Sequence, residues 1–199
     1  MARRALLVFA CLAPLALAAC DPISTGLGVA ANAGTAAVQE RGFTGTANDA
    51  MVKMRVSEAY LHASEKIFLK TTVRVVEGRV LLLGGIAERE LRDRAAVIAW
   101  AQVGVRDVIN ELQPAEEGMG AYTRDTWIAT QIGAALLLEQ NVLAVNYYVD
   151  AVNGAVYLFG VAQDQAELDR VVDRANGVRY VKKVVSYVLL KNDPRRKAG

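Results

Sequence analysis

Residues 73–84 read VRVVEGRVLLLG, and residues 149–160, 76 positions later, read VDAVNGAVYLFG. Glycines and alternating apolar residues match between the two stretches without a gap, which predicts an internal repeat. In each stretch two apolar runs flank a two-residue turn, Glu77-Gly78 or Asn153-Gly154. Asn-Gly between such runs is typical of a β-hairpin, because both turn residues need positive φ. The sequence therefore predicts two copies of one hairpin-containing module.

The segments around each hairpin complete the expected module. A helix is expected before each hairpin, with Asp49 and Asp125 near its start as the expected caps, and a second helix is expected after it. In the second copy the first helix has an apolar stripe at helical spacing. The predicted fold class is α+β, with two tandem αββαβ modules, each a three-stranded mixed sheet with two helices on one face. The expected helices cover residues 49–63, 88–103, 125–140 and 164–176, and the expected last strands cover 105–112 and 179–190.

The offset between the two copies changes near the end of the repeat. Gly104-Val105-Arg106 matches Gly177-Val178-Arg179 at an offset of 73 instead of 76. We therefore expect the second copy to have lost about one helical turn of its second helix. Modules of about 65 residues are marginally stable alone, so we also expect contact between the two modules.

The first twenty residues are typical of an exported bacterial lipoprotein. Arg3 and Arg4 precede an apolar run over residues 5–17, which is shorter than the roughly 20 residues of a membrane span. Leu17-Ala18-Ala19-Cys20 resembles the lipobox of these proteins. The resemblance implies cleavage before Cys20 and covalent attachment of diacylglycerol and an acyl chain. The alternative is an ordinary cleaved signal that leaves Cys20 as a free thiol.

Composition divides the chain into segments. A stretch rich in Gly, Ala, Thr and Ser after Cys20 is typical of a flexible tether, and a stretch with Pro and Gly separates the two copies. The predicted segments are a signal peptide (1–19), the lipidated cysteine and tether (20–47), the first module (48–113), a linker (114–122), the second module (123–191) and a basic tail (192–199).

Charge argues against a nucleic-acid partner. The chain has 23 basic and 21 acidic residues, and removal of residues 1–19 takes Arg3 and Arg4 with it. The processed chain then carries no net charge. A neutral domain lacks the general electrostatic footprint that nucleic acid requires.

Residue types argue against metal and catalytic chemistry. His62 is the only histidine, and of the two cysteines Cys11 leaves with the signal. No metal site and no internal disulfide are therefore expected. The sequence has no nucleophile elbow, phosphate loop or dinucleotide fingerprint. We expect no enzyme activity, no catalytic residue and no cofactor beyond the lipid on Cys20.

Both copies carry the pattern Gly-x-Val-x-Leu-x-Gly, then a helix, then Gly-Val-x-x-Val. The pattern stands as residues 78–84 with 104–108, and again as 154–160 with 177–181. It resembles the BON domain (bacterial OsmY and nodulation). Together with the lipobox, the tether and Asp125-Thr126-Trp127-Ile128, it is similar to the two-BON-domain lipoproteins of Gram-negative bacteria.

This resemblance implies a location and a role. It implies a non-catalytic lipoprotein that is anchored in the outer membrane, faces the periplasm and supports the integrity of that membrane. Asp21, which follows the lipidated cysteine, implies the periplasmic leaflet of the inner membrane as the alternative location. An interaction or stress protein that binds another envelope protein is the alternative role.

The resemblance also implies that the first helix of the second module docks on anionic phospholipid. Trp127 lies one position before Ile128, at the edge of the apolar helix face, with Arg124 one turn earlier and Gln131 one turn later. An indole beside an arginine suits a membrane interface, where the ring takes the headgroup level and the cation meets phosphate. The predicted lipid-binding residues are Arg124, Trp127, Ile128 and Gln131. The alternative is that Trp127 packs against the first module or the linker.

Three other groups of residues are candidates. Trp100 is expected in the core of the first module. The run Leu136–Leu138 is expected to face a membrane or partner, or to be buried between the modules. The candidate basic patch, with a solvated strand edge as its alternative, consists of Arg179, Lys182 and Lys183, joined by the tail residues Arg195, Arg196 and Lys197.

Overall fold

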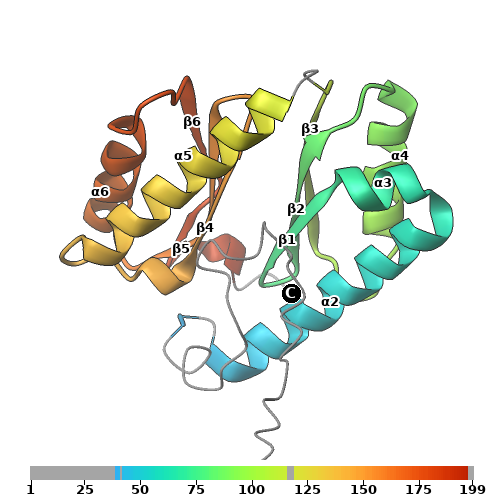
Figure 1. The fold of residues 1–199 in the computed structure, drawn as a ribbon. Coiled ribbons are helices and arrows are strands. Elements are labelled where there is room, and N and C mark those ends of the chain that lie inside the picture. The colour runs from blue at the N-terminus through green and yellow to red at the C-terminus, as the bar shows by residue number, and fades with distance from the viewer. Residues whose placement is uncertain (1–38, 41, 116–118, 197–199) are drawn as a thin grey trace, which may run out of the picture.

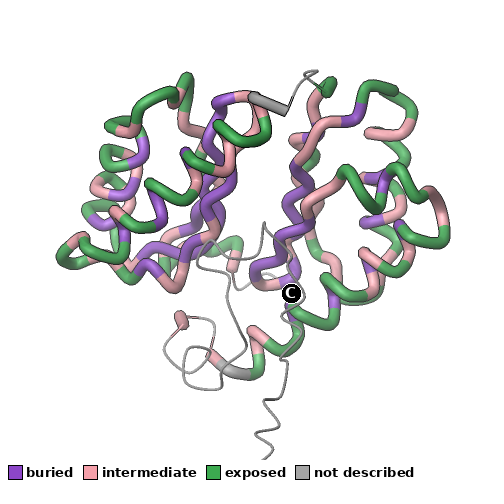
Figure 2. Tube along the Cα trace, in the orientation of Figure 1, coloured by how far each residue is buried: buried purple, intermediate pink, exposed green. Residues whose placement is uncertain are grey.

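Two modules pack through their sheets in the computed structural model, which describes residues 39, 40, 42–115 and 119–196 (Figure 1). The two sheets face each other in the middle of the molecule, and helices cover the outer face of each. Buried residues concentrate in the sheets and on the inward sides of the helices (Figure 2). The layers therefore run helix, sheet, sheet, helix. The predicted signal peptide, Cys20 and most of the predicted tether lie outside the described residues.

The first module confirms the predicted order and mixed sheet. Strand β2 is central, antiparallel to β1 and parallel to β3. One short helix, α3, was not predicted; the Ser64 side chain caps it, and Ile67 anchors it in the core. The elements are α2 (Gly42–Ala63), α3 (Glu65–Lys70), β1 (Thr72–Val76), β2 (Arg79–Gly85), α4 (Arg89–Trp100) and β3 (Asp107–Gln113).

The second module repeats this plan with a divided last strand. Strand β5 is central, antiparallel to β4 and parallel to both β6 and β7. The last strand was predicted as residues 179–190, but pairing begins only at Lys183 and is interrupted at Tyr187 and Val188. The elements are α5 (Met119–Leu138), η1 (Ala144–Asn146), β4 (Tyr147–Val152), β5 (Ala155–Ala162), α6 (Gln165–Asn176), β6 (Lys183–Ser186), β7 (Leu189–Leu190) and η2 (Pro194–Arg196).

The two hairpin turns are as predicted. Glu77 and Gly78 have φ of 53° and 74°, and Asn153 and Gly154 have φ of 55° and 78°. Positive φ at both central residues matches the right-handed twist of the flanking strands. Glutamate occupies this conformation in the first module, where the second has the more usual asparagine.

The prediction that Asp49 and Asp125 cap their helices is wrong. Helix α2 begins at Gly42, inside the predicted tether, and α5 begins at Met119. The Asp49 carboxylate instead accepts the backbone N–H groups of Glu77 and Gly78, each at 2.9 Å. Asp125 accepts those of the second turn at 2.7 and 2.8 Å. Each aspartate therefore fastens its helix to the hairpin turn of its own module, through charge-assisted hydrogen bonds.

The predicted loss of a helical turn in the second copy is also wrong. Helices α4 and α6 have 12 residues each, and β2–β3 and β5–β6 pair with the same register, Arg79 with Asp107 and Ala155 with Lys183. The offset therefore stays at 76 throughout, and the counterpart of Gly104 is Tyr180. Both have positive φ, 93° and 69°.

Each module has its own apolar core between helices and sheet. In α5 the core residues Ile128, Ile132 and Leu136 are fully buried at a spacing of four. In α4 the buried residues are Ala95 and Ala99, so Trp100, one position further round the helix, is 53% exposed. The prediction that Trp100 lies in the core is therefore wrong.

The expected contact between the modules is confirmed. Apolar residues of both sheets form a third core, whose buried members are Val76, Leu81, Leu83, Ala155, Tyr157, Phe159 and Val161. Within this contact Arg74 and Asp150 form two hydrogen bonds of 2.9 and 2.7 Å, with 7% and 8% of each residue exposed. Because the two residues are 76 positions apart, one position of the repeat faces itself across the interface.

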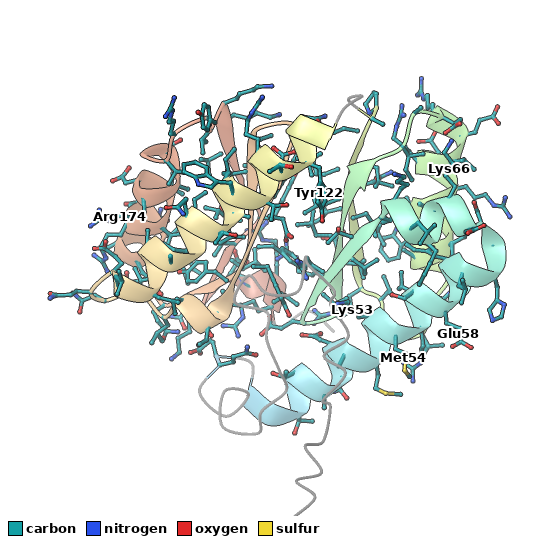
Figure 3. The ribbon with its side chains drawn as sticks, in the orientation of Figure 1. Lys53, Met54, Glu58, Lys66, Tyr122 and Arg174 are labelled. Atoms are coloured by element: carbon teal, nitrogen blue, oxygen red, sulfur yellow. The ribbon has the colours of Figure 1, made fainter. Side chains whose placement is uncertain are left out.

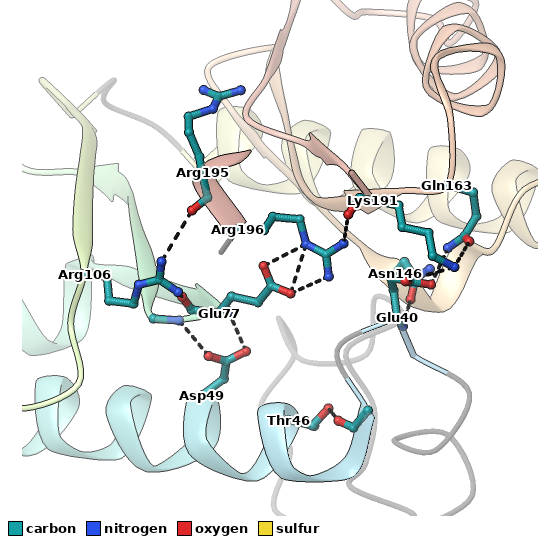
Figure 4. Close-up of polar contacts among 12 residues, drawn as sticks. Glu40, Thr46, Asp49, Glu77, Arg106, Asn146, Gln163, Lys191, Arg195 and Arg196 are labelled. Atoms are coloured by element: carbon teal, nitrogen blue, oxygen red, sulfur yellow. Dashed lines mark hydrogen bonds and ion pairs between the residues drawn. The ribbon is translucent and has the colours of Figure 1, made fainter. Parts of the chain in front are cut away.

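Polar contacts join the ends of the described chain to both modules (Figure 4). Glu40 lies just before α2 of the first module, yet it contacts Asn146, Gln163 and Lys191 of the second. Arg196 of the tail pairs with Glu77 of the first module at 2.6 Å. The segment before α2 therefore binds the second module, and the C-terminal tail binds the first, so both segments hold the modules together. Lys197 lies outside the described residues.

Candidate functional site

Helix α5 places Trp127 at the surface and Ile128 in the core. Trp127 is 41% exposed, whereas Ile128 is completely buried. The prediction that Ile128 contacts lipid is therefore wrong, because its side chain packs under the helix against the sheet. Arg124 and Gln131, one turn before and after Trp127, are exposed as expected.

The structure adds Tyr180, which the sequence prediction missed. Its ring lies 5.7 Å from the Trp127 ring, centroid to centroid, in an edge-to-face arrangement of 70°. This is a favoured geometry for an aromatic pair. Tyr180 comes from the loop between α6 and β6 and is 48% exposed. The aromatic surface therefore spans two elements.

Two arginines flank the Tyr180 ring. The guanidinium carbon of Arg124 lies 5.8 Å from the ring centroid, and that of Arg179 lies 4.5 Å from it. These are cation–π distances. In the part of the chain that the structure describes, no carboxylate pairs with either arginine. We call Arg124, Trp127, Arg179 and Tyr180 the aromatic–arginine cluster.

The predicted basic patch divides into separate groups. Arg179 belongs to the aromatic–arginine cluster, whereas the Lys182 side chain lies over Gly154 and Lys183 is an exposed residue at the start of β6.

The tail arginines form ion pairs away from this patch. Arg195 binds Asp193 at 2.6 Å, and Arg196 binds Glu77 (Figure 4), so neither extends the patch. Ion pairs within the protein therefore neutralise the charges of Arg195 and Arg196.

The first module lacks the cluster although its backbone is the same. At the positions of Arg124, Trp127, Arg179 and Tyr180 it has Asn48, Met51, Val103 and Gly104. On α2 the side chains of Met54 and Glu58 point away from the sheet (Figure 3). Met51 and Val103 are exposed as well, but they carry neither an aromatic ring nor a charge, and the exposed Trp100 belongs to a different position of the repeat.

The remaining candidates lie apart from this cluster. Leu137 and Leu138, 60% and 86% exposed, face solvent at the far end of α5, whereas Leu136 is core. His62 is exposed beside Glu58. Within the described ranges, no three His, Cys, Asp or Glu side chains gather as a metal site. In the same ranges, no helix has the length and apolar character needed to cross a membrane.

The fold and the cluster define a tandem-repeat α+β protein with a surface site on one repeat. The family model "BON domain" matches residues 44–115 and 124–192, and the chain belongs to this family. The predicted resemblance is thereby confirmed, as is the fold class.

Several proteins are similar in sequence. A protein of Anaplasma centrale, described as an uncharacterized protein in the gshII 5′ region, is 37% identical over 153 residues, which are 75% of this chain and 99% of that protein. The outer membrane lipoprotein DolP of Haemophilus influenzae is 32% identical over 56% of this chain and 59% of its own length. A 21 kDa hemolysin of Actinobacillus pleuropneumoniae is 32% identical over 60% of this chain and 61% of its own. The chain thus spans about three-fifths of the last two relatives.

A solved structure is similar only at a low level. The C-terminal domain of CdsD, titled the structural protein of the type III secretion system of Chlamydia trachomatis, is 11% identical with a TM-score of 0.30. The match covers 69% of this chain and 96% of that one. At this score the likeness adds no argument about function.

Proposed function

We propose that this protein is a non-catalytic envelope lipoprotein that binds anionic phospholipid through its second BON domain and supports outer-membrane integrity. The observation that carries the proposal is the exposed aromatic–arginine cluster on the second domain. The family, and a relative named as an outer membrane lipoprotein, support a non-catalytic role in the envelope.

The cluster has the composition of a membrane-interface site. Trp127 and Tyr180 each present an apolar ring with a polar edge, and such side chains prefer the headgroup level of a bilayer. Arg124 and Arg179 add positive charge at the same place, and each basic residue near an anionic surface contributes about 1 kcal/mol. Aromatic and cationic groups together predict a preference for anionic over zwitterionic membranes.

The lipid on Cys20 supplies the second attachment in this proposal. Stable membrane anchoring generally takes two signals, because one acyl chain alone binds only marginally. We place the anchor in the outer membrane, with the inner membrane as the alternative because of Asp21. Density-gradient separation of the two membranes from cells that make the full chain decides between them, and palmitate labelling that Cys20→Ser abolishes tests the anchor itself.

The central experiment is co-sedimentation with vesicles. The processed chain carrying Cys20→Ser, which cannot be lipidated, is mixed with phosphatidylglycerol vesicles or with phosphatidylcholine vesicles. We expect binding to the anionic vesicles only, and loss of that binding in Trp127→Glu. Trp100→Glu, which alters an exposed tryptophan of the first domain, is the matched control and keeps full binding. An unmodified chain that stays in the supernatant contradicts the proposal.

One observation favours a protein partner as the second candidate. Val97, Trp100 and Val103 of the first domain are 68%, 53% and 76% exposed. An exposed apolar group of this kind is typical of an interaction surface. Under this alternative, crosslinking in intact cells yields an adduct with an envelope protein that Trp100→Glu removes and Trp127→Glu preserves.

A further inference from the structure

We infer that Arg124, Arg179 and Tyr180 form a clamp for the phosphodiester of an anionic phospholipid headgroup, so that the loop between α6 and β6 recognises lipid together with α5. This inference rests on the proposed function and assigns the residues that distinguish one headgroup from another.

The geometry brings two like charges to one ring. Arg124 reaches Tyr180 from α5 at 5.8 Å, and Arg179 reaches it from the adjacent loop position at 4.5 Å. Two positive charges placed around one ring repel one another, and within the described chain neither has an ion pair with a carboxylate. A bound anion between or beside the guanidiniums relieves that repulsion. The cluster is thus poised for an anionic group from outside the protein.

The backbone of Tyr180 also points to a function. A φ of 69° is unfavourable for a bulky residue, and the first domain has Gly104 at the same position. Unfavourable conformations that persist are concentrated at binding sites. The ring held there gives both arginines one platform and contacts Trp127. Tyr180 is therefore a positioning residue for the two guanidiniums.

The charge and shape of the two guanidiniums indicate which ligand the cluster binds. A guanidinium is planar and donates two parallel hydrogen bonds to the two free oxygens of a phosphodiester. Two guanidiniums for one phosphate leave local positive charge, which disfavours a headgroup that carries its own cation, such as choline. The exposed faces of Trp127 and Tyr180 favour a ligand that also has an apolar part, and a soluble phosphate has none. The ligand is therefore a phospholipid whose headgroup has no cation, such as phosphatidylglycerol.

The test uses variants that separate geometry from charge. Arg124→Lys and Arg179→Lys keep the charge but lose the planar donor pair, and we expect each to weaken binding of the unlipidated processed chain to phosphatidylglycerol vesicles by about fivefold to tenfold. Tyr180→Gly restores the first-domain residue and relieves the backbone. It should weaken vesicle binding similarly while urea unfolding shows no loss of stability. Lys183→Ala, outside the cluster, is the matched control and should change affinity less than about twofold.

The outcomes separate this inference from the proposed function. If Trp127→Glu abolishes binding while the lysine and Tyr180→Gly variants bind normally, the domain binds lipid but the clamp is wrong. If the unmodified chain fails to bind, both are wrong. Millimolar inorganic phosphate, compared with a chloride salt of equal ionic strength, should not displace the protein from vesicles. Specific displacement by phosphate would reassign the cluster to a soluble anion and overturn the assignment to a headgroup.

Discussion

The two domains share one backbone and differ in the surface that it presents. Both fasten the first helix to a hairpin turn through an aspartate, and both pair the last strand in the same register. Yet only the second combines two aromatic rings with two arginines, at positions where the first has Asn48, Met51, Val103 and Gly104. The proposed site therefore depends on four side chains and not on the fold.

The interface between the domains shows a second kind of divergence. The repeat position that faces itself holds Arg74 in one domain and Asp150 in the other, so attraction replaces the like-charge contact that two identical copies would make. Similarly Glu111 and Tyr187, also 76 positions apart, are hydrogen-bonded to each other. Differences between the copies therefore make them complementary.

The largest expected effect comes from breaking that complementarity. Arg74→Ala leaves the Asp150 carboxylate buried without its partner, and loss of one member of a buried pair typically costs about 3–5 kcal/mol. We expect the free energy of unfolding, measured by urea denaturation, to fall by this amount. Arg74→Ala with Asp150→Ala should recover part of the loss, because the unpaired charge is gone. Equal losses in the single and double variants would show that the pair does not act as a unit.

The next effect distinguishes the two left-handed loop positions. A Cβ at Gly104 lies 2.8 Å from Cγ2 of Val52 and also has to adopt φ of 93°, so Gly104→Ala should lower the free energy of unfolding by about 1–3 kcal/mol. Tyr180→Gly at the equivalent position should cost nothing or stabilise the protein. Thermal unfolding of both variants checks this. Equal destabilisation would mean that the two loops do not share one conformation.

A smaller effect concerns alkaline pH. Burial first, and then Glu111, raises the pKa of Tyr157 and of Tyr187 to about 12. The unfolded value is about 10, so the neutral phenols favour the folded state below pH 10, and this contribution is lost as pH rises through 12. The first domain has Leu81 and Glu111 at the equivalent positions, so it has no counterpart of this tyrosine pair. We expect the free energy of unfolding to fall between about pH 10 and 12. In the double variant Tyr157→Phe with Tyr187→Phe this fall should be smaller, because neither phenol is present to ionise.

Local patterns were sufficient to predict the two long helices, the hairpin and the last strand of each domain in their order, but not the short helix α3. Alternating valines and the Glu77-Gly78 and Asn153-Gly154 turns specify two hairpins, because few residues suit positive φ at both turn positions. The start of α2 was missed because residues 42–48 are rich in Gly and Thr, which have low helix propensity. Tertiary contacts just before this stretch, such as that of Glu40 with Asn146, overrule the propensity.

The site was only half predictable for a different reason. Trp127 and Arg124 follow from helical spacing along one element, whereas Tyr180 joins them through a contact between elements. The apparent shift of the repeat to an offset of 73 hid the equivalence of Tyr180 and Gly104. With the offset kept at 76, both aromatic residues stand out as features of the second copy alone.

The most direct test uses the two tryptophans of the chain, Trp100 in the first domain and Trp127 in the second. In the unlipidated processed chain, Trp100→Phe leaves only Trp127 to fluoresce, and Trp127→Phe leaves only Trp100. We predict that phosphatidylglycerol vesicles containing brominated acyl chains shift the Trp127 emission to shorter wavelength and quench it. The same vesicles should leave Trp100 emission unchanged. A shift and quenching of Trp100 with Trp127 unaffected would contradict the assignment of the membrane site to the second domain.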